Sequence, residues 1–225
     1  MSDDEFARAR DRMVREQLVA RDITDRRVLE AMRSVPRHLF VPADLQSVAY
    51  RDAPLPIGKR QTISQPYIVA LMSQLLHLHG DEVVLEIGTG SGYQAAVLSR
   101  LARQVYSLER IPELARAASK RLLGMGIGNV EVLARDGSTG LPEHAPYQGV
   151  LVTAGAPRVP EPLKDQLEEA GRLILPVGSQ EGQLLELWTR RGNDFVREVV
   201  APVAFVPLLG DEGWERDERP DSWFT

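Results

Sequence analysis

A glycine-rich turn with the pattern acid-x-G-x-G-x-G is the part of the sequence that most directly indicates chemistry. It follows a short apolar run, Val83 to Leu85, and precedes a helical pattern. Glycines between a strand and a helix allow a tight turn and let backbone N–H groups approach a ligand. We therefore predict a ligand-binding turn made by Glu86, Gly88, Thr89, Gly90, Ser91 and Gly92.

The spacing within this turn excludes two common phosphate-binding motifs. The dinucleotide fingerprint needs a small residue at the sixth position, and counting from Gly88 that position holds Tyr93. No lysine follows at the place that a P-loop requires. The turn is thus expected to bind a different kind of cofactor.

Two further acids follow the next two predicted strands. Glu109 comes at the end of the second strand, where a carboxylate can accept hydrogen bonds from both hydroxyls of a ribose. Asp136 and Gly137 come after the third strand and face the same crevice of an open α/β sheet. Each has a plainer alternative, because Glu109 could pair with Arg110 at the surface and an Asp-Gly pair is a common turn.

Short β-rich runs alternate with helical patterns from residue 82 onward, and this alternation predicts an α/β fold. A doubly wound, mostly parallel sheet results when one helix separates each pair of strands. The last two strands are joined by a predicted hairpin at residues 191–194 and should be antiparallel. Seven strands are expected at 83–87, 105–108, 130–134, 150–153, 172–176, 184–189 and 195–206, and helices at 93–102, 112–123 and 162–169.

The first 80 residues predict an added helical layer. Apolar residues at helical spacing indicate two short amphipathic helices before Pro36. Prolines and a glycine between residues 50 and 62 indicate a loop. Ser64 can then cap a helix over the apolar run 68–76.

Composition excludes several other classes of protein. The chain has 225 residues and no cysteine, which rules out disulfides, a thiol nucleophile, thiolate zinc sites and cysteine-ligated clusters. Its four histidines lack metal-binding spacing, so no metal is expected. The net charge of −5 argues against a nucleic-acid surface, and six acids against two arginines in residues 211–221 supply most of it.

The sequence also predicts a location. The first residues lack the basic and apolar regions of a secretory signal, and the longest apolar run, 199–209, contains two prolines. We expect a cytoplasmic protein that does not bind a membrane.

Several segments together resemble the protein-L-isoaspartate O-methyltransferases, a family of class I S-adenosylmethionine-dependent enzymes with a Rossmann-like sheet. The glycine motif is shared by many methyltransferases, whereas the Thr-Ile-Ser-Gln-Pro loop is more specific. The resemblance runs from about residue 10 to residue 209. The segments that carry it are 61–67 (QTISQPY), 86–93 (EIGTGSGY), 145–147 (APY), 171–178 (GRLILPVG) and 205–208 (FVPL).

The resemblance implies a repair reaction on damaged proteins. A methyl group passes from S-adenosyl-L-methionine, which becomes S-adenosyl-L-homocysteine, to the free α-carboxylate of an L-isoaspartyl residue. The resulting ester closes to a succinimide that can reopen as aspartate. Thr62, Ile63 and Ser64 would then bind the substrate, with Ser64 catalytic, and Asp136 with Gly137 would hold the adenine. The lack of cysteine fits polar rather than radical use of this cofactor.

This interpretation divides the chain into one methyltransferase domain with three parts. Residues 1–80 form the helices and substrate loop, 81–209 the cofactor-binding core and 210–225 an acidic tail that either folds back or is solvated. The expected partners are isoaspartyl-containing proteins and peptides, bound by a monomer. Lys59 and Arg60 depart from the pattern we expect before the loop.

Three alternatives stay open at this stage. The chain could methylate another acceptor, such as a hydroxyl or an amine of a small molecule or nucleic acid. It could be an inactive cofactor-binding module used for interactions, although such a module would not need the acids of the motif. A dehydrogenase is disfavoured by Tyr93.

Overall fold

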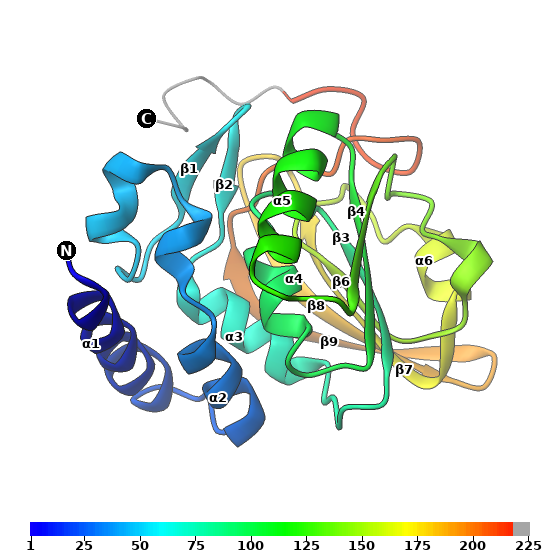
Figure 1. Cartoon of the computed structure of the whole chain (residues 1–225). Helices are drawn as coiled ribbons and strands as arrows, with labels where there is room; N and C mark the ends of the chain where they lie inside the picture. The colour runs from blue at the N-terminus through cyan, green and yellow to red at the C-terminus, as the bar shows by residue number, and fades with distance from the viewer. Residues whose placement is uncertain (218–225) are drawn as a thin grey trace.

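A seven-stranded sheet forms the centre of the computed structural model, which describes residues 1–217 (Figure 1). The strand order is β5-β4-β3-β6-β7-β8-β9, with parallel pairing from β5 to β7 and antiparallel pairing of β8 with both neighbours. This confirms the predicted mostly parallel sheet with a C-terminal hairpin. The strands are β3 (Val83–Ile87), β4 (Gln104–Glu109), β5 (Val130–Ala134), β6 (Tyr147–Val152), β7 (Leu167–Gly178), β8 (Gln183–Arg191) and β9 (Asp194–Val203).

The direction of winding changes beside β3. The chain runs outward from β3 to β4 and β5, then returns to place β6 on the other side of β3. In open α/β sheets, ligands bind at such a switch point, outside the carboxyl ends of the strands. The fold therefore brings the ends of β3, β4 and β6 together at one crevice.

One face of the sheet is covered by three helices and the N-terminal layer. Side chains on this face, such as Val84 and Val105, pack in one core with the N-terminal helices. The covering elements are α1 (Asp3–Met13), the π-helix η1 (Val14–Val19), α2 (Arg26–Ser34), the 3-10 helices η2 (Arg37–Phe40) and η3 (Ala43–Val48), α3 (Pro66–Leu75), α4 (Tyr93–Leu98) and α5 (Pro112–Gly124). The predicted helical layer is thus confirmed.

The other face carries a thinner cover. Leu85 and Ile87 point to this side and pack with Leu163 of the short helix α6 (Glu161–Asp165). They also pack with Leu208 of residues 204–217, which follow the last strand and which we call the C-terminal segment. A 3-10 turn, η4 (Pro142–His144), lies in the connection before β6. In residues 1–217, no helix has the length and apolarity needed to span a bilayer.

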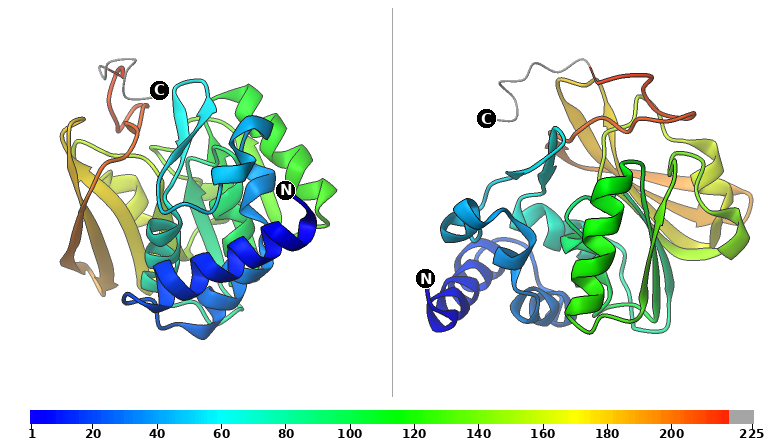
Figure 2. Two further views of the ribbon diagram at one scale, coloured as in Figure 1. Left: turned by 90° about the vertical axis from the view of Figure 1, so that its left-hand side faces the viewer. Right: turned by 45° about the horizontal axis from the view of Figure 1, so that its top comes forward.

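A small hairpin replaces the loop expected at 50–62. Strands β1 (Leu55–Gly58) and β2 (Gln61–Ile63) pair in antiparallel fashion, and the turn residues Lys59 and Arg60 have φ of 55° and 56°. The sequence lacks the Asn-Gly or Asp-Gly pair from which such a hairpin is usually predicted. The turned views place this hairpin beside the C-terminal segment (Figure 2), and Arg60 Nε lies 4.0 Å from Asp217 Oδ2.

The predicted helix at 162–169 is too long. Helix α6 ends at Asp165, and Leu167 already belongs to β7, where it pairs with Tyr147 of β6. Leu167 is fully buried in this pairing, so tertiary burial outweighs the helical preference of the residues that follow it.

Candidate active site

Two adjoining pockets open at the carboxyl ends of the parallel strands. The first, of about 360 Å³, is lined by Gly88 and Gly90 of the glycine turn, and we call it the glycine-loop pocket. The second, of about 440 Å³, is lined by Ser64, and we call it the Ser64 pocket. Thr62, Thr153 and Val206 line both pockets. Molecules bound in the two pockets would therefore meet at these three side chains.

The glycine turn has the backbone geometry that its sequence predicts. Gly88, Gly90 and Gly92 all have positive φ, of 95°, 52° and 87°. Gly88 is also in close contact with Thr153, whose hydroxyl donates to the Gly88 carbonyl oxygen at 2.6 Å. A Cβ atom on Gly88 would lie 2.3 Å from Thr153 Oγ1. Only glycine fits here, because both the conformation and the space exclude a side chain.

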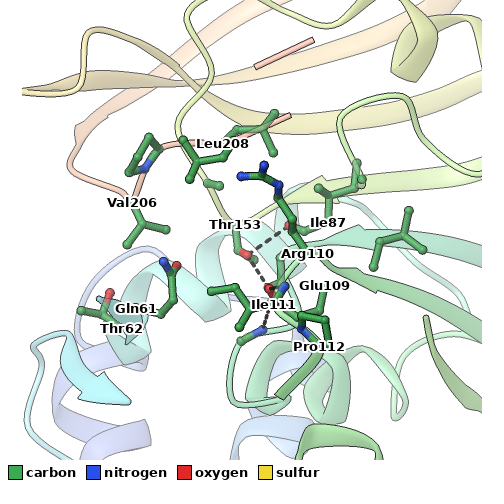
Figure 3. A pocket seen from close by; sticks show the side chains of 17 residues that line it. Gln61, Thr62, Ile87, Glu109, Arg110, Ile111, Pro112, Thr153, Val206 and Leu208 are labelled. Atoms are coloured by element: carbon green, nitrogen blue, oxygen red, sulfur yellow. Dashed lines mark hydrogen bonds between the residues drawn. The ribbon is translucent and has the colours of Figure 1, made fainter. Parts of the chain in front are cut away.

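Glu109 lies at the wall of the glycine-loop pocket, opposite Thr62 (Figure 3). Its Oε2 accepts the Gly90 N–H at 2.8 Å and its Oε1 accepts the Ile111 N–H at 2.9 Å. Burial raises the pKa of Glu109, while these backbone hydrogen bonds act in the opposite direction. Each carboxylate oxygen can accept a second hydrogen bond. Glu109 is thus a fixed acceptor that can bind two adjacent ligand hydroxyls.

Glu86 lies beneath the turn and lines neither pocket. It is fully buried, its Oε2 accepts the Ser107 hydroxyl at 2.5 Å, and its Oε1 has no hydrogen-bond partner among residues 1–217. Burial raises the pKa of Glu86 to about 8, against the Ser107 hydrogen bond. The Ser107 hydroxyl also lies 2.5 Å from Thr89 Oγ1. Glu86 and Ser107 therefore support the turn from below.

Asp136 lies next to the pocket and binds the C-terminal segment. Its Oδ1 accepts the Ser138 N–H at 2.8 Å and its Oδ2 accepts the Asp211 N–H at 2.9 Å. Burial acts to raise the pKa of Asp136, but these hydrogen bonds outweigh it and the pKa is lowered. Gly137 lines the pocket directly. Asp136 thus connects the strand end to the chain after Leu209.

The first part of the acidic tail folds back over this edge. Trp214 donates through Nε1 to the Gly155 carbonyl at 3.1 Å, and its backbone N–H donates to Leu208. Figure 3 shows Val206 and Leu208 across the pocket from Pro112. Trp223 and Phe224, which the tail prediction also included, lie outside the described residues.

Ser64 does not cap the helix that follows it, so that prediction is wrong. Helix α3 begins at Pro66 with Gln65 as its N-cap, and no side chain of the cap residue takes part. Ser64 is half-buried and lines the Ser64 pocket, and its hydroxyl has no hydrogen-bond partner within residues 1–217. Thr62 lines both pockets, whereas Ile63 is buried in the core.

Several residues of the site were not predicted from the sequence. Thr153 follows β6, and its place at a strand end beside the glycine turn was the signal that could have found it. Ser107 carries no such signal, because only the folded sheet brings it to the turn. Val206 lies in the segment 205–208 that carries the family resemblance, but its place in the site follows only from the fold. Lys59 lines neither pocket and its Nζ lies 3.0 Å from Glu113 Oε1.

Comparison with known proteins assigns this arrangement to a family. The model of the protein-L-isoaspartate(D-aspartate) O-methyltransferase family matches residues 8–213. The chain belongs to this family. It is 56% identical over 210 residues to protein-L-isoaspartate O-methyltransferase 1 of Syntrophobacter fumaroxidans, covering 93% of this chain and 98% of the relative. Membership confirms the activity expected from the sequence, a protein-L-isoaspartate O-methyltransferase that uses S-adenosylmethionine.

Solved structures agree with this assignment. A protein-L-isoaspartate O-methyltransferase structure with 30% identity superposes with a TM-score of 0.82, over 91% of this chain and 67% of the other. A Plasmodium falciparum protein described as a family member, in complex with S-adenosyl-L-homocysteine, shares the fold with a TM-score of 0.77. It has 24% identity and covers 89% of this chain and 98% of its own.

The glycine-loop pocket fits the cofactor of the family. Its volume of about 360 Å³ suits a small organic ligand. Glu109 offers a fixed carboxylate for a pair of hydroxyls, and Gly90 presents backbone without a side chain at the same wall. Apolar side chains of Ile111 and Leu208 complete a surface suited to a flat ring.

Proposed function

We propose that methyl transfer takes place where the two pockets meet. S-Adenosylmethionine would lie in the glycine-loop pocket, and the isoaspartyl residue of a protein or peptide would lie in the Ser64 pocket. The observation that carries this proposal is the sharing of Thr62, Thr153 and Val206 by both pockets. Two molecules bound in this way are held in contact, which supplies much of the rate enhancement of a bimolecular reaction.

Cofactor binding is divided among the residues of the strand ends. The turn from Gly88 to Gly92, which includes Thr89 and Ser91, would hold the amino-acid part of S-adenosylmethionine. Glu86 would support this turn from below through Ser107. Glu109 would accept the ribose hydroxyls through the oxygen lone pairs that the backbone leaves available. Asp136 and Gly137 would bound the adenine side together with the C-terminal segment.

The acceptor needs orientation more than activation. S-Adenosylmethionine, when bound, supplies a methyl group on a positively charged sulfur. A carboxylic acid with an ordinary pKa is already ionised at pH 7, so no general base has to remove a proton. Ser64, which lines the pocket without a protein partner for its hydroxyl, would donate a hydrogen bond to one carboxylate oxygen. Thr62, which lines both pockets, would help to exclude water from the transfer path.

Repair then follows in the substrate itself. The neighbouring backbone amide nitrogen attacks the new ester carbonyl, methanol leaves, and a succinimide forms. Hydrolysis of the succinimide can open it to a normal aspartyl residue. This sequence needs no further group from the chain.

The expected setting of the reaction follows from charge and surface. The net charge of −5 offers no broad basic field for nucleic acid, and a substrate found in many proteins gains little from a strong field. We propose that the enzyme acts as a cytoplasmic monomer on isoaspartyl-containing proteins and peptides. Nucleic acids and membranes are not expected partners.

The role of Ser64 is tested by Ser64→Ala. We expect kcat/KM for an isoaspartyl peptide to fall by about ten-fold or more, because a hydrogen bond to a charged group is lost. The affinity for S-adenosyl-L-homocysteine, measured by calorimetry, should stay within about two-fold of the parent. Ser119→Ala, a similar change on α5 away from both pockets, is the matched control. Equal turnover in Ser64→Ala and parent would remove Ser64 from the mechanism.

A further inference from the structure

The helix that follows Ser64 begins without a cap from its own sequence. Helix α3 starts at Pro66, which has no N–H, and its N-cap residue Gln65 makes no side-chain cap bond. The first backbone donor that needs a partner is therefore the N–H of Tyr67. A Ser, Thr, Asp or Asn at the N-cap commonly supplies the acceptor, and Ser64 is the residue just before the N-cap Gln65.

Asp52 supplies the acceptor instead, from a segment before the β1/β2 hairpin. Its Oδ1 accepts the Tyr67 N–H at 3.2 Å. Its Oδ2 accepts the side-chain amide Nε2 of Gln65 at 2.7 Å. A carboxylate at a helix N-terminus is also favoured by the helix dipole. One carboxylate therefore fixes both the residue after Ser64 and the first turn of the helix.

The segment that carries Asp52 is itself anchored. Arg37 is fully buried, and it donates through Nε to the carbonyl of Ala49 at 2.8 Å and through Nη2 to that of Ala53 at 3.5 Å. These carbonyls lie on either side of Asp52. Arg21 Nη1 also lies 3.2 Å from Asp52 Oδ2, but this pair is partly exposed and contributes little by itself.

This arrangement has a consequence for the acceptor site. Ser64 and Gln65 line the same pocket, and Pro54, two residues after Asp52, lines it too. Because Asp52 caps the helix, the Ser64 hydroxyl is not used as a cap. We propose that Asp52 is a positioning residue for methyl transfer, which caps helix α3 and orders Gln65 so that the Ser64 hydroxyl is available to the acceptor carboxylate. This inference rests on the role proposed for Ser64.

A double-mutant cycle tests whether Asp52 acts through Ser64. We would compare the parent, Asp52→Ala, Ser64→Ala and the double variant, with kcat and KM for an isoaspartyl peptide. Asp52→Ala should lower kcat/KM by about ten-fold or more, because the hydroxyl loses its fixed place. In the Ser64→Ala background the same change should cost less than about two-fold, since residues that act as a unit are not additive.

Two further measurements separate positioning from general damage. The affinity for S-adenosyl-L-homocysteine should stay within about two-fold of the parent in Asp52→Ala, because Asp52 lines neither pocket. Hydrogen exchange should become faster at the Tyr67 amide, which loses its acceptor. Asp52→Asn keeps one acceptor oxygen for this N–H, and it should fold normally and retain most of the turnover.

Asp25→Ala is the matched control for the loss of a helix cap. Asp25 caps α2 by accepting the N–H groups of Arg27 and Val28 at 2.8 and 3.3 Å, away from both pockets. Its removal should lower the thermal stability while leaving kcat/KM within about two-fold of the parent.

The outcomes separate this inference from the function on which it rests. In one outcome, Ser64→Ala lowers kcat/KM while Asp52→Ala lowers it by the same factor whether Ser64 is present or replaced. Asp52 then does not act through Ser64, and this inference is overturned while the role of Ser64 stands. If Ser64→Ala leaves kcat/KM unchanged, the role of Ser64 fails and the inference fails with it. A loss confined to the Ser64-containing background supports both.

Discussion

Asp136 accepts a hydrogen bond from the backbone N–H of Asp211 at 2.9 Å, which joins the end of β5 to the C-terminal segment. The contact is close packed, since a Cβ atom on Gly210 would lie 2.2 Å from Asp136 Oδ1. Ser138 strengthens it by accepting the Glu212 N–H at 3.0 Å. Asp136, for which we propose a contact with adenine, therefore also holds the segment that we propose to bound the adenine.

Asp136→Asn should weaken cofactor binding by about ten-fold. The side-chain NH₂ of asparagine would face the N–H of either Ser138 or Asp211, so that this backbone donor loses its acceptor. Calorimetry with S-adenosyl-L-homocysteine measures this effect. Asp81→Asn, at the opposite end of β3, is the control and should bind as the parent does. An unchanged affinity in Asp136→Asn would show that this contact does not matter for the pocket.

Glu86→Gln should change how stability depends on pH. Burial raises the pKa of Glu86 to about 8, above its ordinary value of 4.5, so the folded state binds a proton that the unfolded state releases between these pH values. The stability from this group is complete below pH 4.5 and is lost as the pH rises toward 8, by roughly 1 kcal/mol per pH unit. Glutamine resembles the neutral acid and lacks this loss.

Chemical unfolding of the cofactor-free protein at pH 5 and pH 8 measures the difference. Glu86→Gln should gain stability relative to the parent as the pH rises. Glu131→Gln, on an exposed position of β5, serves as the control. Parallel pH profiles for parent and Glu86→Gln would contradict a neutral Glu86.

Gly88→Ala should abolish measurable cofactor binding and destabilise the fold by about 1–3 kcal/mol, because φ is 95° and the new Cβ would clash with Thr153 Oγ1. Gly124→Ala is the matched control, since a Cβ there meets no atom within 4 Å. Calorimetry with S-adenosyl-L-homocysteine and thermal unfolding of the two variants measure these effects. Cofactor affinity retained in Gly88→Ala would mean that the turn adapts.

The sequence predicted those parts of the site that follow from local patterns. The apolar runs predict where the strands end, and these ends place Gly88 and Glu109 at the same edge of the sheet. In the structure both residues line one pocket, and Glu109 accepts the Gly90 N–H. Ser64 shows the limit of such reasoning. Its position predicts a helix cap, yet a carboxylate distant in sequence takes that place.

Other contacts depend on the assembled sheet. Ser107 reaches Glu86 only because β4 pairs with β3, and Val206 reaches the pockets only after the chain has passed through β9. Likewise the stretch after Asp165 becomes a strand because Leu167 is buried against Tyr147. No local pattern encodes these partners, since each is set by the packing of distant segments.

The central claim is tested most directly by methyl transfer to paired peptides that differ only in one Asp or isoAsp residue. The protein would be incubated with methyl-labelled S-adenosylmethionine and each peptide. We predict base-labile label on the isoAsp peptide and none on the Asp peptide. Label on neither peptide, with S-adenosyl-L-homocysteine still bound, would contradict the proposed reaction and favour another acceptor or an inactive binding module.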